Sequence, residues 1–89
     1  MYLDHITIDG KSVRLIKPIA VNARFQDSMY FCQNEDLGIA SISSRLEECI
    51  KDFREKVLFV WNEYGKASDD ILTDGAKELK RRIQQYVMK

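Results

Sequence analysis

The sequence predicts an α+β domain, in which an antiparallel sheet of four to five strands packs on a long helix and a second, C-terminal helix follows. Two alternating apolar and polar runs, 2–8 and 11–17, flank an Asp-Gly pair, which is typical of a β-hairpin. Strands come first and helices afterwards, an order that favours α+β over parallel βαβ units. The long helix is indicated by an apolar stripe: Leu46, Ile50, Phe53, Val57, Val60 and Tyr64.

The first half of the chain contains the predicted strands. Residues 2–17 form the first hairpin, and Pro18, which has no amide hydrogen, marks an edge, a bulge or a change of strand. Residues 19–25 and 29–33 form a second hairpin around a polar turn. A short strand at 39–43 leads into the helix. One face of the third run is predicted to be apolar, with Ile19, Val21, Ala23 and Phe25.

Two helices are expected in the second half. The main helix spans residues 44–65, with Ser44 and Glu47 as a capping box and Gly65 just beyond the last turn. The C-terminal helix spans residues 73–88 and has Thr73 as its N-cap. Its apolar stripe consists of Ala76, Leu79, Ile83, Tyr86 and Val87. Residues 1–89 are expected to form a single domain.

Charge and cysteine content narrow the function classes. Fourteen basic residues balance fourteen acidic ones, so the long-range positive field of a typical nucleic-acid-binding domain is absent. The two cysteines, Cys32 and Cys49, and the single histidine suggest neither a disulfide framework nor a zinc site. The N-terminus lacks a signal-peptide pattern, and no apolar run is long enough for a membrane span. We therefore expect a cytoplasmic protein with no membrane association.

Two short motifs carry a family resemblance. Asp36-Leu37-Gly38 corresponds to a D-L-P-G turn without its proline, and Leu46-Glu47-Glu48-Cys49 corresponds to an L-E-E-A helix start with Cys in place of Ala. With this order and spacing, residues 19–57 resemble the HicB-like antitoxin family, which has a partial ribonuclease-H-like fold. Relative to that family, the hairpin at 1–17 is extra and the DNA-binding tail is lacking.

The resemblance implies a non-catalytic, antitoxin-type protein that binds and neutralises a small, basic ribonuclease toxin of the HicA type. Acidic side chains would then face the toxin, and the candidates are Glu35, Asp36, Glu47 and Glu48. A solvated loop and a helix start that favours anions explain the same residues without a partner, and this plainer interpretation is favoured.

The segment 58–61 is apolar almost all round and must be covered on every side. Either the second helix folds back over it, or it forms a subunit interface, and both can hold in so small a chain. We expect a homodimer with Phe59 and Trp61 at or near the interface. The candidate partner or dimer interface is Leu58, Phe59, Trp61 and Tyr64.

The C-terminal helix carries a basic surface formed by Lys77, Lys80, Arg81 and Arg82. A solvated face that partly pairs with Glu78 is favoured over a nucleic-acid patch, because no exposed aromatic residues are interleaved. A nucleic-acid-associated regulator and an orphan dimeric structural protein remain the alternatives to the antitoxin-type module. His5 has no nucleophile or second histidine near it in sequence, so we expect no catalytic or metal site, no cofactor and no enzyme activity.

Overall fold

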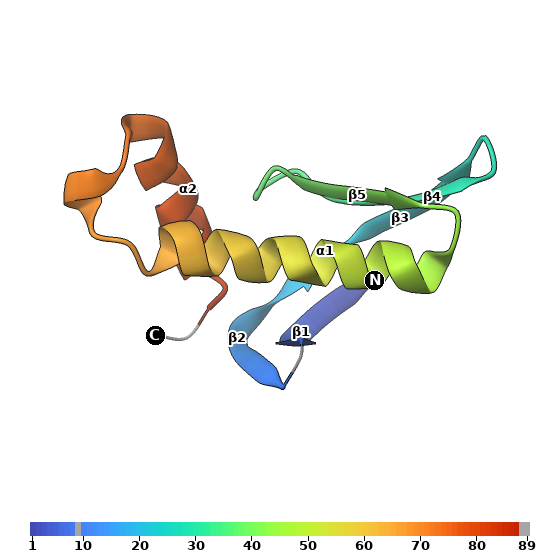
Figure 1. Cartoon of the computed structure of the whole chain (residues 1–89), viewed down its shortest axis with the longest axis horizontal. Coiled ribbons are helices and arrows are strands. Elements are labelled where there is room, and N and C mark those ends of the chain that lie inside the picture. The colour runs from blue at the N-terminus through green and yellow to red at the C-terminus, as the bar shows by residue number, and fades with distance from the viewer. Residues whose placement is uncertain (9, 88–89) are drawn as a thin grey trace.

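The computed structural model describes residues 1–8 and 10–87 and has the predicted α+β character. Figure 1 shows the strands β1 and β2 on one side of a long helix and β3, β4 and β5 on the other. Asp9 of the predicted turn and residues 88–89 at the end of the predicted second helix lie outside the described residues. The elements are β1 (Tyr2–Ile8), β2 (Lys11–Ala20), β3 (Asn22–Gln26), β4 (Met29–Asn34), β5 (Ile39–Ser43), α1 (Leu46–Val60), a π-helical turn (Trp61–Gly65), a 3-10 turn (Asp69–Ile71) and α2 (Asp74–Gln84).

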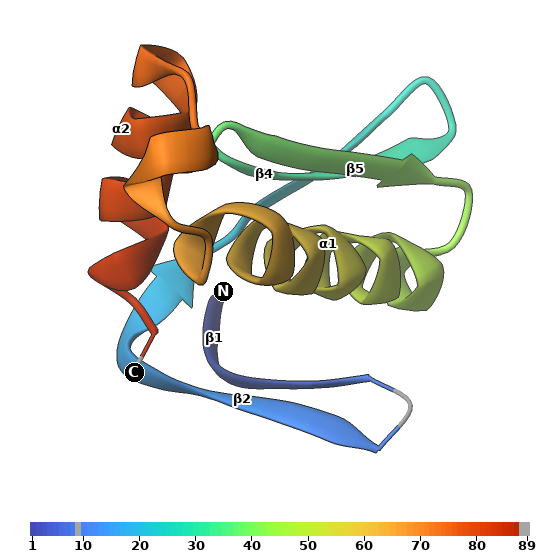
Figure 2. The same ribbon diagram turned by 60° about the vertical axis from the view of Figure 1, so that its left-hand side comes forward.

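The strands form two antiparallel sheets, β1-β2 and β3-β4-β5, so the prediction of one sheet of four to five strands is wrong. Helix α1 lies between the sheets, as the view in Figure 2 shows. Phe53 and Val57 of the predicted stripe are buried, but so is Cys49, whose Sγ lies 3.4 Å from the Tyr30 carbonyl oxygen. The buried residues Cys49, Phe53, Val57 and Val60 form one stripe of α1, and the helix contacts β4 and β5 of one sheet and β1 of the other.

The β1-β2 hairpin contains the irregularity that Pro18 predicts. Leu3 pairs with Ile19 and His5 pairs with Arg14, so residues 15–18 of β2 bulge opposite a single residue of β1. The C-terminal segment pairs with this bulge: the Ile16 amide donates to the Tyr86 carbonyl over 2.6 Å, and Leu15 forms a bridge with Val87. Backbone groups of the β2 bulge that have no partner in β1 thus find partners in the C-terminal segment.

The second sheet follows the predicted hairpin but begins later. Ile19 pairs within β2, and the chain passes between the sheets at Val21, which exchanges backbone hydrogen bonds with Met1. Ile19 and Val21 are buried, whereas Ala23 and Phe25 are exposed, so the predicted apolar face of residues 19–25 is only half correct. Strand β3 is exposed along its whole length because, within this sheet, α1 packs mainly on β4 and β5.

Asn34 ties the two sheets together. Its Nδ2 donates to the Ala20 carbonyl over 2.8 Å, and its Oδ1 accepts from the Leu37 amide over 2.9 Å. The side chain therefore fixes both the end of β2 and the turn between β4 and β5, which carries Asp36.

Helix α1 begins at Leu46, two residues later than predicted, and the Ser44 capping box is wrong. Arg45 is the N-cap residue and its side chain makes no capping hydrogen bond. Ser43 provides the polar contacts instead: its Oγ accepts from the Arg45 amide over 3.2 Å and donates to Glu48 Oε2 over 3.2 Å. Ser43 can do this because it is the last residue of β5 and still points toward the helix.

The helical path continues through residues 61–65 as a π-helical turn, and α2 then folds back over it. Trp61 is buried, and its ring fills the space where a Cβ at position 65 would lie, so Gly65 is needed here for close approach. The predicted Thr73 cap is confirmed, since its Oγ1 accepts from the Ala76 amide over 3.2 Å. Helix α2 ends at Gln84, before the predicted end, and Tyr86 lies in the turn that follows.

Candidate interaction surfaces

The structure divides the predicted interface of residues 58–64. Trp61 lies in the core, and Leu58 and Tyr64 are half-buried against it, whereas Phe59 is 57 % exposed. Of the two expected covers for this segment, the structure shows the second helix: α2 packs on the π-helical turn, and the buried Trp61 ring offers little exposed surface to a second subunit. Phe59 alone keeps the character of an interface residue.

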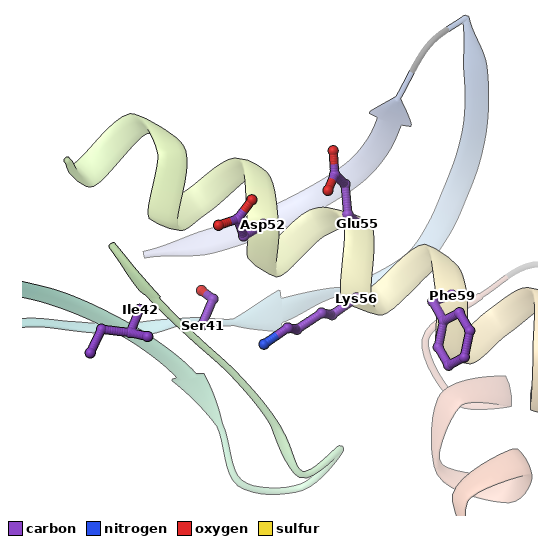
Figure 3. Close-up of a pocket in the computed structure, with 6 residues that line it drawn as sticks. All are labelled: Ser41, Ile42, Asp52, Glu55, Lys56 and Phe59. Carbon is purple, nitrogen blue, oxygen red and sulfur yellow. The ribbon is translucent and has the colours of Figure 1, made fainter. Parts of the chain in front are cut away.

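Phe59 borders a groove between α1 and strand β5, which we call the α1–β5 groove. Figure 3 shows Asp52, Glu55, Lys56 and Phe59 on the helix and Ser41 and Ile42 on the strand. Lys56 reaches across, and its Nζ donates to the Ala40 carbonyl oxygen over 2.5 Å. Ile42 is 52 % exposed. The groove thus combines exposed apolar groups with charges of both signs.

The outer edge of β5 carries backbone groups that no described strand pairs with. Asp27 and Ser28 form a two-residue turn with φ of 52° and 63°, typical of type I′, so Gln26 and Met29 flank it as a hydrogen-bonded pair. Hydrogen-bonded and non-bonded pairs then alternate along the register, which directs the backbone groups of residues 30, 32 and 34 toward β5.

Their partners in β5 are residues 43, 41 and 39, so the backbone groups of Ala40 and Ile42 point away from the sheet. The Lys56 hydrogen bond to the Ala40 carbonyl agrees with this direction. An open strand edge partly covered by a lysine is a known means of limiting edge-to-edge association, and it is also a template for a further strand.

A second exposed apolar cluster lies near the start of α1, and we call it the distal patch: Ala23, Arg24, Phe25, Tyr30 and Leu46. Phe25 is 61 % exposed and Leu46 is 40 % exposed. The Phe25 and Tyr30 rings are 4.7 Å apart between centroids. The cluster is exposed because β3 projects beyond the sheet area that α1 covers.

The distal patch was not predicted from the sequence, where Phe25 and Leu46 were assigned to apolar faces. One feature of the sequence does indicate that Leu46 is exposed: it lies in the first turn of the helix, directly before two glutamates. Glu47 and Glu48 follow Leu46, and each lies 3.7 Å from the Arg45 guanidinium. These ion pairs are exposed and weak, so both carboxylates still face solvent beside the patch.

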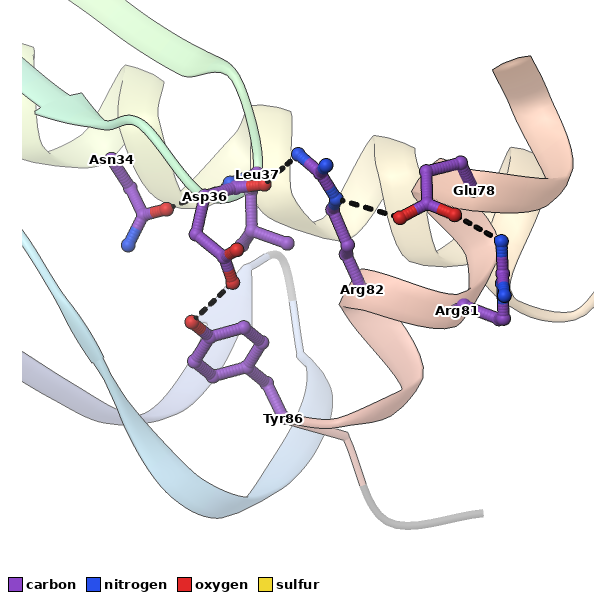
Figure 4. Close-up of polar contacts among 7 residues, drawn as sticks. All are labelled: Asn34, Asp36, Leu37, Glu78, Arg81, Arg82 and Tyr86. Atoms are coloured by element: carbon purple, nitrogen blue, oxygen red, sulfur yellow. Dashed lines mark hydrogen bonds and ion pairs between the residues drawn. The ribbon is translucent and has the colours of Figure 1, made fainter.

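The four acidic candidates do not form one surface. Glu35 and Asp36 lie in the turn before β5, and Glu47 and Glu48 lie after it, so the length of a strand separates the two pairs, roughly 13 Å. Asp36 is also held within the fold: Tyr86 donates to its Oδ2 over 2.7 Å and Arg82 donates to its carbonyl oxygen over 3.0 Å (Figure 4). Of the four, Glu47 and Glu48 directly follow Leu46 of the distal patch in the first turn of α1.

The basic candidates of α2 are largely engaged with neighbouring acceptors. Lys80 donates to the Ala67 carbonyl over 2.6 Å and pairs with Asp69 at 2.8 Å. Arg81 and Arg82 both pair with Glu78, as Figure 4 shows. Lys77 lines a hollow together with Asp69, Lys80 and Arg81. These contacts reduce the positive field that a nucleic acid would meet.

Several titratable groups are perturbed by their surroundings. Burial, together with the hydrogen bond to Asp36 and its charge, raises the pKa of Tyr86 to about 12. Burial and the neighbouring Cys49 thiol raise the pKa of Cys32 to about 11, and both cysteines are free. The hydrogen bond from Lys80 and its positive charge lower the pKa of Asp69. The described residues contain no group of three or more His, Cys, Asp or Glu side chains placed to hold a metal ion.

Within residues 1–8 and 10–87, neither helix is long and apolar enough to span a membrane. Comparisons with family models, with curated proteins and with solved structures found no match.

Proposed function

We propose that this protein is a non-catalytic interaction module whose distal patch binds a protein partner. The observation that carries the proposal is the solvent exposure of Phe25 and Leu46 beside the acidic first turn of α1. Aromatic and aliphatic side chains exposed together are enriched at protein–protein interfaces, and a charged rim steers the partner's approach.

The chemistry of the patch favours a basic partner. Glu47 and Glu48, in the same first turn of α1 as Leu46, attract positive charge, while Phe25, Tyr30 and Leu46 offer apolar surface that a partner can desolvate. The resemblance to HicB-like antitoxins suggests the same class of partner, a small basic ribonuclease toxin that the module would neutralise. The basic face of α2 supports a nucleic-acid role less well, because Lys80, Arg81 and Arg82 already have acceptors.

The test is reconstitution with a partner identified by co-purification from the native host. The purified partner should bind the wild-type chain, and Leu46→Ser should weaken binding about tenfold or more through loss of buried apolar surface. Replacing Glu47 and Glu48 by lysine should slow association, most strongly at low salt. The proposal fails if the partner is acidic, or if it binds the Leu46 and glutamate variants as tightly as the wild-type chain.

A further inference from the structure

We infer that two copies of this chain associate through their β5 edges, with Ala40 of each copy paired with Ile42 of the other. The two β5 strands would run antiparallel about a twofold axis near Ser41 and join the three-stranded sheets of both copies into one. This surface is distinct from the distal patch, so the inference goes beyond the proposed function and either can fail without the other.

The backbone edge specifies this register. The outward amide and carbonyl groups of Ala40 and Ile42 are the groups that β4 leaves unpaired in the middle of β5. Pairing Ala40 with Ile42 of the partner subunit satisfies all of these groups on both copies. A register centred on Ala40 or on Ile42 satisfies the groups of only one residue in each copy.

In the same register, the charged side chains of the α1–β5 groove of one copy would face opposite charges of the second copy. Helix α1 runs antiparallel to β5, and Lys56 lies over Ala40. Asp52 precedes Lys56 by about one helical turn, a rise of about 6 Å, and Ile42 follows Ala40 by about 6.6 Å. Asp52 therefore lies near the level of Ile42, so Lys56 of one copy would face Asp52 of the partner subunit.

The spacing of the helices also permits the contact. Cys49 of α1 contacts carbonyl oxygens of both β4 and β5, so the helix lies above the space between those strands. A strand separation of about 4.8 Å then places the two copies of α1 roughly 9–10 Å apart, which is the usual distance for packed helices. The exposed ring of Phe59 would pack near the first turns of α1 of the partner subunit.

Lys56 would change its contact on association. In a single copy its Nζ donates a hydrogen bond to the Ala40 carbonyl oxygen, which must instead accept from a backbone amide when a second strand pairs with β5. On pairing, the backbone amide of Ile42 of the partner subunit replaces Nζ, and the ammonium group moves to the facing carboxylate. The lysine thus blocks irregular edge pairing while allowing a partner that supplies a carboxylate at this position.

The first test compares Ile42→Pro with Ile42→Thr by sedimentation velocity across micromolar concentrations. Proline removes the outward amide but no hydrogen bond within the chain's own sheet, whereas threonine keeps the amide and also loses the apolar side chain. Wild-type protein should associate to twice the chain mass of 10.4 kDa. Ile42→Pro should weaken association about tenfold or more, and Ile42→Thr should weaken it clearly less.

The second test exchanges the facing charges and does not depend on a proline. Lys56→Glu alone and Asp52→Lys alone should each be monomeric, because like charges then face each other across the twofold axis. An equimolar mixture of the two variants should recover the dimer, since both facing pairs are again opposite in sign. Circular dichroism of each variant checks that the fold is intact.

Monomeric wild-type protein at all concentrations overturns the inference, and so does a dimer that survives Ile42→Pro or a mixture that stays monomeric. The inference would also be overturned if the wild-type protein were monomeric and Ile42→Pro abolished binding of a protein partner. In that case the β5 edge would be the binding site for that partner. A dimer with the predicted sensitivities that binds no basic partner would support the inference while the proposed function fails.

Discussion

The Tyr86 hydroxyl donates a 2.7 Å hydrogen bond to Asp36 Oδ2 across a separation of 50 residues. It joins the end of the chain to the turn between β4 and β5, and the Lys17 ammonium lies 4.5 Å from the centre of the Tyr86 ring. Tyr86→Phe should lower the free energy of unfolding by about 1–2 kcal/mol, because a hydrogen bond to a carboxylate is lost. Urea denaturation measures the change.

Tyr64→Phe is the matched control for this prediction, since Tyr64 is a half-buried tyrosine whose hydroxyl has no hydrogen-bond partner among the described residues. It should change the free energy of unfolding by less than about 0.5 kcal/mol. An equal effect of the two variants would show that the contact with Asp36 contributes nothing beyond the packing of the ring.

The same tyrosine predicts a loss of stability at high pH. Its pKa is raised from 10.0 to about 12 in the folded protein, chiefly by burial and then by Asp36, so the folded state favours the protonated hydroxyl. The resulting stability is fully present below about pH 10 and is lost between about pH 10 and 12, by about 2 kcal/mol. Tyr86→Phe should remove this part of the pH dependence, which chemical denaturation in alkaline buffers can measure.

Gly65→Ala should destabilise the fold by about 2 kcal/mol or more, because the added Cβ overlaps the Trp61 ring. Gly75→Ala is the control: nothing lies within 4 Å of a Cβ at that position in α2, and alanine is the better helix former. The control should raise the free energy of unfolding by up to about 1 kcal/mol. Similar thermal midpoints for the two variants would contradict the tight packing of Trp61.

The buried thiols should be inert in the folded protein. Cys32 and Cys49 are fully buried, and the raised pKa of Cys32 keeps its thiol protonated at neutral pH. Labelling by a disulfide reagent at pH 8 should therefore proceed only at the rate of unfolding. Rapid labelling in the absence of denaturant would mean that β4 and α1 separate locally.

Local patterns in the sequence predicted much of the secondary structure. The turn between β3 and β4, the Thr73 cap and the apolar stripes of both helices depend on residues close in sequence, whose chemistry decides the local conformation. Pro18 correctly marked an irregular strand, because a missing amide has the same consequence in any fold.

Long-range contacts account for what the sequence did not predict. The division into two sheets depends on packing of β1 and of β4-β5 against α1, contacts between elements that are distant in sequence. The apolar pattern of residues 58–61 predicts that they are covered, but it does not decide between α2 and a second subunit, because α2 is distant in sequence. Phe25 was placed in an apolar face because periodicity does not reveal where the covering helix ends.

The central claim is that the distal patch binds a basic protein partner, and two exposed phenylalanines test it most directly. Phe25 is 61 % exposed in the distal patch, and Phe59 is 57 % exposed beside the α1–β5 groove. Phe25→Ser and Phe59→Ser therefore remove equally exposed rings from two different surfaces. Isothermal titration with the purified partner should show binding weakened about tenfold or more by Phe25→Ser and unchanged by Phe59→Ser. Equal affinities for the Phe25 variant and the wild-type chain would contradict the account.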